Sequence, residues 1–264
     1  MISKERRRLA EEMTGFEAVN GEAVKNYLME AGGQPVRAMV TTTWRSGSTF
    51  LGDIMTAHPG TFYHYEPLLH YDIVQARSGA LAEDAVTTLS SLMRCNYTSL
   101  GGVHVYRLCE DSLTSVQAGT CSTASSTSGC SLTMSHSGLT VWPTVPSLES
   151  PTAGTLSSST GWLHSDLSFI IYTMLHFRFC PLFPYQSIKT VRLRLNLTKP
   201  LVEELNVRIL LLVRDPRGTV ESRKHRVWCP GNRDCEDPAR LCQDLQSDHE
   251  AFLSLSALYP GRYK

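Results

Sequence analysis

Arginine, glycine and hydroxyl residues stand together at one point of the chain where they could hold an anion. Residues 41–50 (TTTWRSGSTF) follow a short β-branched run, 36–42 (VRAMVTT), and precede an apolar pattern of helical spacing. Backbone N–H groups in such a loop, with the positive end of the helix dipole, form an anion cradle, and Arg45 adds a full charge. The alternative is a plain turn in which Gly47 permits a tight bend. The loop lacks the GxxxxGK(S/T) pattern, so it does not favour a kinase or an ATPase.

A second strand-to-helix junction carries another candidate anion-binding arginine. Residues 206–213 (NVRILLLV) are almost continuously apolar, as expected of a strand buried on both faces of a parallel sheet. Arg214 stands at the carboxyl end of this run, and Pro216 begins a helix. Ser222 lies two helical turns after Arg214. Ligands in open α/β sheets bind outside the carboxyl ends of strands, so Arg214 is placed to meet a phosphate in bidentate fashion. An ordinary salt-bridge network at the strand end is the alternative.

The elements that would position these residues predict an α/β fold. A third strand is expected at 187–193 (SIKTVRL), followed by a short helix capped by Thr198, with Pro200 in its first turn. Near the C-terminus, apolar residues recur at helical spacing and indicate core packing; they are Leu241, Leu245, Phe252, Leu255 and Tyr259.

Composition excludes several classes of protein. The chain has 264 residues, of which 42% are hydrophobic, and its formal net charge is zero, which gives no support to a nucleic-acid partner or an anionic membrane surface. No apolar run reaches the length of about 18 residues that spans a bilayer, and the basic N-terminus lacks the apolar stretch of a signal peptide.

The cysteines and two glycosylation sequons indicate an oxidising, secretory-pathway lumen. Eight cysteines form no CxxC pair and no Cys/His ligand spacing, so we expect no metal site. The sequons begin at Asn96 and Asn196. Cys229 and Cys235 are six residues apart in a turn-rich stretch, so we predict that they form a disulfide, or that one of them pairs with Cys242.

The chain divides into four segments. We expect a helical lead-in at 1–34, two parts of one α/β domain at 35–110 and 176–264, and a low-complexity insert at 111–175. About half of residues 112–160 are Ser or Thr, and Glu149 is the only Asp, Glu, Lys or Arg among them. Such a stretch cannot bury enough apolar surface to order itself. It is interpreted either as a mucin-like flexible insert or as translated intron sequence, and in both cases no defined fold is expected.

Together the two junctions resemble a known family. Residues 44–71 (WRSGSTFLGDIMTAHPGTFYHYEPLLHY) resemble the 5′-phosphosulfate loop of Golgi carbohydrate sulfotransferases, and most closely the galactose, N-acetylglucosamine and N-acetylgalactosamine 6-O-sulfotransferase group. Residues 188–195 (IKTVRLRL) and 206–223 (NVRILLLVRDPRGTVESR) resemble the same family's 3′-phosphate motif. The resemblance covers 36–109 and 180–264 and skips the Ser/Thr-rich middle.

The resemblance implies a P-loop-like parallel sheet, with 3′-phosphoadenylyl sulfate (PAPS) as sulfuryl donor and no metal. Arg45 would stabilise charge on the leaving phosphate oxygen. Arg214 and Ser222 match the family's ligands of the 3′-phosphate. This contact would select PAPS over ATP, because ATP has no 3′-phosphate. The residues that would hold the 5′-phosphosulfate are Arg45, Ser46, Gly47, Ser48, Thr49 and Phe50.

The implied reaction transfers a sulfuryl group to a sugar hydroxyl on a glycan or glycoprotein acceptor in the Golgi lumen, at the 6-O position of N-acetylglucosamine, galactose or N-acetylgalactosamine. Since an alcohol is a poor nucleophile, a base is needed. Glu66 is the candidate, with His64 and His70 as alternatives; a structural ion pair is the competing interpretation of Glu66. The alternative function is that of an inactive, PAPS-binding or structural relative.

Two departures from the family pattern concern the ends of the chain. Family members continue beyond the run that YPGRYK resembles, and they carry an N-terminal membrane anchor. The resemblance therefore implies a C-terminally truncated chain whose membrane association would depend on an anchor missing from this sequence.

Overall fold

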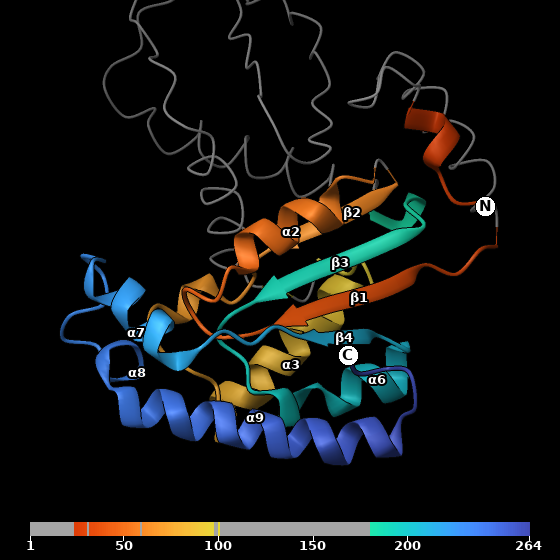
Figure 1. The fold of residues 1–264 in the computed structure, drawn as a ribbon. Helices are drawn as coiled ribbons and strands as arrows, with labels where there is room; N and C mark the ends of the chain where they lie inside the picture. Colours follow the sequence, from red (N-terminus) through yellow and green to blue (C-terminus); the bar gives the residue numbers. More distant parts are fainter. Residues whose placement is uncertain (1–23, 31, 59, 98–99, 101–179) are drawn as a thin grey trace, which may run out of the picture.

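The fold is built on a parallel sheet whose strands run in the order β2-β3-β1-β4. The computed structural model describes residues 24–30, 32–58, 60–97, 100 and 180–264 (Figure 1). The strands are β1 (Val36–Thr41), β2 (Thr61–Tyr65), β3 (Tyr185–Thr190) and β4 (Arg208–Leu211). All neighbouring strands are parallel, and Met39 of β1 lies opposite Ile188 of β3 and Ile209 of β4. The predicted α/β class and the parallel pairing of the two motif-bearing strands are confirmed.

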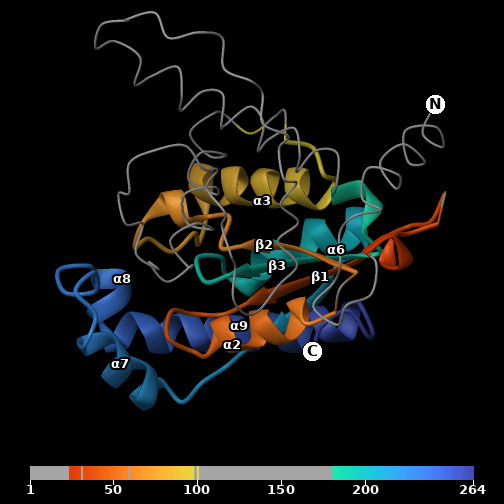
Figure 2. The same ribbon diagram turned by 90° about the horizontal axis from the view of Figure 1, so that it is seen from above.

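Helices cover both faces of this sheet. Figures 1 and 2 show α2 on one face and α3 and α6 on the other, while the long α9 runs along the β4 side of the molecule. The α-helices are α2 (Ser48–Thr56), α3 (Gly79–Met93), α6 (Lys199–Leu205), α7 (Pro216–Lys224), α8 (Arg233–Glu236) and α9 (Pro238–Leu258). Short 3₁₀ turns are η2 (Val24–Tyr27), η3 (Leu69–Tyr71), η4 (Cys180–Leu182) and η5 (Leu195–Thr198).

Two strands are shorter or earlier than the sequence predicts. The run 206–213 forms a strand only at 208–211, because Asn206 caps α6 in the left-handed conformation (φ 57°). The expectation that this strand is buried on both faces is wrong, since Arg208 is exposed and Leu210 and Leu211 are only partly buried. The strand expected at 187–193 instead covers 185–190. Thr198 stands at the predicted N-cap of α6, but its hydroxyl donates to the carbonyl of Leu195 rather than capping the helix.

The face of α9 that packs inward is partly ionic, whereas its sequence pattern predicts apolar core packing alone. Leu241 and Leu255 are buried as expected, but Asp244 and Asp248 are buried beside them. Asp248 pairs with Arg194 (3.0 Å) and accepts the backbone N–H of Leu195. These contacts fasten α9 to the segment that follows β3.

Two disulfides lie among the described residues. Cys229 and Cys235 are joined, which confirms the predicted pairing, and Cys242 is an exposed free thiol. Cys95 and Cys180 form a second disulfide that the sequence pattern did not predict. The Ser/Thr-rich stretch, including Cys121 and Cys130, and most of the N-terminal lead-in lie outside the described residues. Of the helices in the described ranges, none is long and apolar enough to cross a membrane.

Candidate functional site

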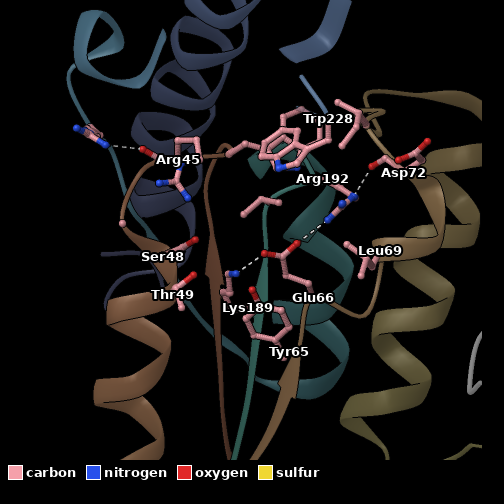
Figure 3. Close-up of a pocket in the computed structure, with 15 residues that line it drawn as sticks. Arg45, Ser48, Thr49, Tyr65, Glu66, Leu69, Asp72, Lys189, Arg192 and Trp228 are labelled. Carbon is pink, nitrogen blue, oxygen red and sulfur yellow. Dashed lines mark hydrogen bonds and ion pairs between the residues drawn. The ribbon is translucent and has the colours of Figure 1, made fainter. Parts of the chain in front are cut away.

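A cleft of about 820 Å³ lies where the carboxyl ends of all four strands meet. In Figure 1 the arrowheads of β1 and β3 point toward α7 and α8, which is the end of the sheet that carries this cleft. Each strand contributes a charged residue to the wall of the cleft: Arg45 after β1, Glu66 after β2, Lys189 and Arg192 in and after β3, and Arg214 after β4 (Figure 3).

The loop after β1 adopts a conformation suited to an anion. Gly47 has φ 95°, and Arg45 has φ 67°, which is uncommon for a residue with a side chain. Ser48 then begins α2, and Gly47, Ser48 and Thr49 line the cleft. Left-handed residues in a turn that leads into a helix N-terminus aim successive N–H groups at one point, where negative charge is stabilised.

Direct hydrogen bonds join the two motifs, although 169 residues separate their arginines. The Arg214 guanidinium donates to the backbone carbonyl of Arg45 (2.8 Å), and the Arg45 Nε–H donates to the Ser222 hydroxyl (3.1 Å). Partial burial, followed by the charges of Arg226 and Arg214, lowers the pKa of Arg45 below its ordinary value. Positive charges that repel one another in this way are stabilised when an anion binds between them.

Glu66 is held between two buried cations. Its carboxylate accepts hydrogen bonds from the Lys189 ammonium and from Arg192 Nη1 (2.6 Å), and the side chains of these two cations are almost fully buried. Burial acts to raise the pKa of Glu66, but the two positive charges and their hydrogen bonds outweigh it and hold the pKa below its ordinary value. Glu66 is therefore ionised and also has a left-handed backbone (φ 41°).

The structure brings together some of the residues that the sequence singled out and separates others. Ser46 does not line the cleft, because its hydroxyl donates to the Thr43 carbonyl (2.8 Å) within the loop. Phe50 also lies outside the cleft and is 72% exposed. Ser222 is absent from the cleft wall and instead contacts Arg45.

Neither alternative base borders the cleft. His64 is buried, and its Nε2 is hydrogen-bonded to the Tyr97 hydroxyl (2.8 Å). His70 lies 4.0 Å from a carboxylate oxygen of Asp84. Both imidazoles thus serve contacts elsewhere in the fold.

Sequence reasoning missed Lys189, Arg192 and Trp228, all of which line the cleft. Lys189 and Arg192 carry one signal: each is a charged residue within or shortly after a strand whose other positions are mostly buried. Because Lys and Arg are rarely buried without a partner, such a position indicates a specific contact. Trp228 stands in a turn between α7 and α8, where no periodicity marks it. Over the described ranges, no group of His, Cys, Asp or Glu is arranged to hold a metal ion.

Fold and site together define a class of protein. A parallel α/β sheet presents a helix N-terminus, a left-handed loop and two arginines from distant segments to one cleft at the strand ends. This arrangement is typical of proteins that bind a ligand with more than one anionic group, such as a nucleotide.

Comparison with curated proteins finds similarity to carbohydrate sulfotransferases. Carbohydrate sulfotransferase 7 of Mus musculus is 39% identical over 67 residues, which are 23% of this chain and 13% of the relative. Carbohydrate sulfotransferase 5 of Homo sapiens is 29% identical over 210 residues (74% of this chain, 43% of the relative), and carbohydrate sulfotransferase 1 of Rattus norvegicus is 26% identical over 248 residues (85% and 57%). Over these stretches the chain is similar to several proteins named carbohydrate sulfotransferases.

The chain spans between about an eighth and just over half of the length of these relatives. No model of a known protein family and no solved structure matches it.

Proposed function

We propose that this protein transfers a sulfuryl group from PAPS to a sugar hydroxyl of a glycan, at the 6-O position of N-acetylglucosamine, galactose or N-acetylgalactosamine. The observation that carries the proposal is the contact between Arg45 and Arg214, because it brings two anion-binding motifs from distant strands into one cleft. Relatives named carbohydrate sulfotransferases support the reaction class.

The residues present fit a donor with two separated anionic groups. The backbone N–H groups of the loop 45–49 would hold the 5′-phosphosulfate at the start of α2. Arg214, which is exposed at the cleft wall, would hold the 3′-phosphate through its guanidinium, and Ser222 would support the site through its bond to Arg45. The donor supplies the sulfuryl group when bound, in a cleft whose volume is within the range of ligand sites.

The chain's own residues have distinct roles in this proposal. Glu66 takes the proton that the sugar hydroxyl loses as its oxygen forms the new bond to sulfur. Arg45 stabilises the negative charge on the phosphate oxygen that is released when the old S–O bond breaks. Lys189 and Arg192 keep Glu66 ionised and orient it at the cleft wall. Because most of the work is positioning and charge stabilisation, the proposal needs no metal.

The double ion pair of Glu66 favours a second candidate, a relative that binds PAPS without transferring sulfate. A carboxylate that accepts from two cations is a weaker base than a free one. The two candidates share the nucleotide site and differ only in the role of Glu66.

We also propose that the protein works in an oxidising lumen such as the Golgi. The two disulfides, Cys95–Cys180 and Cys229–Cys235, support an oxidising compartment.

Calorimetry with adenosine 3′,5′-bisphosphate, the product nucleotide, tests the donor site. Arg214→Ala should weaken its binding by about 1.5–3 kcal/mol, the range for one charge-assisted contact, without a matching loss for 5′-AMP. Arg217→Ala is the matched control, since Arg217 is three residues away, is highly exposed and pairs with Asp215 outside the cleft. Equal affinity of the unaltered protein for 5′-AMP and for the bisphosphate would remove the role of Arg214.

A further inference from the structure

The cleft has two chemically different ends. In Figure 3, Arg45, Ser48 and Thr49 lie at one end, and Leu69, Asp72 and Trp228 lie at the other. Glu66 and Lys189 stand between the two groups, joined by an ion pair. If an anionic donor occupies the arginine end, the second reactant must approach Glu66 from the end that carries Trp228.

The turn that carries Trp228 is fixed in place by several bonds. Its carbonyl accepts the Asn232 side-chain amide (2.8 Å), and the next residue, Cys229, is buried and joined to Cys235. The backbone N–H of Asn232 also donates to the Cys229 carbonyl (3.0 Å). These bonds hold the backbone of Trp228 in place, so less backbone entropy is lost when a ligand contacts the indole.

Asp72 adds a carboxylate to this end of the cleft. Its φ is positive (56°), and its carbonyl accepts Arg192 Nε (2.6 Å), so the residue is held by the same arginine that pairs with Glu66. Its side chain is exposed and can accept hydrogen bonds from hydroxyl groups.

We propose that Trp228 and Asp72 form the acceptor subsite, in which an uncharged pyranose lies with one face on the indole and its hydroxyls toward the carboxylate. A pyranose ring has an apolar face of C–H groups, which a large flat aromatic surface covers well. A uronic acid or an already sulfated sugar is disfavoured here, because its charge would meet the Asp72 carboxylate. This inference rests on the proposed function, and it names the acceptor as a neutral hexose or hexosamine.

Saturation-transfer NMR with N-acetyllactosamine, in the presence of adenosine 3′,5′-bisphosphate, tests the subsite without requiring turnover. Trp228→Ala should weaken sugar binding about tenfold and Trp228→Phe by less, since phenylalanine keeps part of the apolar face. Val227→Ala is the matched control: Val227 is the neighbouring residue, 98% exposed and outside the cleft wall. Affinity for the bisphosphate should stay unchanged in all three variants.

The outcomes separate this inference from the proposed function. Sugar binding that is lost in Trp228→Ala, with nucleotide binding intact, supports the subsite even if transfer of sulfate is never detected. Failure of the unaltered protein to bind the sugar, or equal sugar binding by Trp228→Ala, overturns it even if the nucleotide binds. As a second measurement, Asp72→Asn should reduce the preference for N-acetyllactosamine over a uronate-containing chondroitin disaccharide, and an unchanged preference contradicts the role of Asp72.

Discussion

If Glu66 is the base of the proposed reaction, catalysis and structure make opposite demands on it. Lys189 and Arg192 hold the pKa of its carboxylate below the ordinary value of about 4.5, so the fold stabilises the ionised form. This stabilisation is complete above the ordinary pKa and is lost only as the pH falls through the lower folded value. We therefore expect the rate of sulfate transfer to show no loss attributable to Glu66 between about pH 5 and pH 8, measured as kcat against pH.

Substitution of Glu66 separates a base from a structural ion pair. Glu66→Gln should lower kcat by about 10²–10⁴-fold if the carboxylate is the base. It also leaves two buried cations uncompensated, which costs on the order of 3–5 kcal/mol of unfolding free energy. Binding of adenosine 3′,5′-bisphosphate therefore serves as the check that the variant is folded.

If Glu66→Gln does not fold, Glu66→Asp keeps the charge and shortens the side chain, so transfer should fall while nucleotide binding remains. A folded Glu66 variant that transfers sulfate at the unaltered rate would show that the ion pair is structural only.

At the scale of elements, α2 and β2 meet at a contact that only glycine allows. A Cβ on Gly52 of α2 would collide with the hydroxyl of Tyr63 on β2, and that hydroxyl is buried without a hydrogen-bond partner among the described residues. The close approach sets the position of the helix whose N-terminus lines the cleft.

Gly52→Ala should therefore lower the unfolding free energy by about 1–3 kcal/mol, the range for overpacking, although alanine favours a helix over glycine by about 1 kcal/mol. In a Tyr63→Phe background the colliding oxygen is gone and the ring carbon Cζ at 3.1 Å is the nearest atom, so the same substitution should cost clearly less. Urea denaturation of the four proteins measures both effects, and an equal loss in the two backgrounds would contradict the packing argument.

At the scale of the whole molecule, the two disulfides constrain the chain unequally. Cys95–Cys180 joins residues 85 apart, whereas Cys229–Cys235 joins residues only six apart. In the chain-entropy model the longer loop contributes about 4.5 kcal/mol to stability and the shorter one about 2 kcal/mol. The long-range disulfide is buried in the core, where it joins the chain just after α3 to the turn η4 before β3.

Replacing Cys95 and Cys180 by alanine should thus cost about 2 kcal/mol more unfolding free energy than replacing Cys229 and Cys235. Denaturation in the absence of reductant measures the difference, and adding reductant to the unaltered protein provides the comparison in which both bonds open. If the short-range pair proves the more stabilising, the entropic account is wrong for this fold.

Much of the arginine end of the cleft could be predicted from the sequence, because its signals are local. A β-branched run, a glycine-containing loop and a helical pattern are read within about twenty residues, and they placed Arg45 and Arg214 at the carboxyl ends of strands that the structure shows to be parallel. The Cys229–Cys235 disulfide could be predicted for the same reason, since a turn brings its ends together.

The rest depended on which distant segments meet. The pairing of Glu66 with Lys189 and Arg192 requires β2 and β3 to lie side by side, although 123 or more residues separate the partners, and local periodicity carries no information about such pairing. The ionic face of α9 depends in the same way on an arginine beyond β3. The sequence by itself determined the elements and the two arginines, through short-range backbone and side-chain preferences. Only the tertiary structure decided which charges are neutralised, and which of the expected residues border the cleft, because both depend on contacts between strands far apart in the chain.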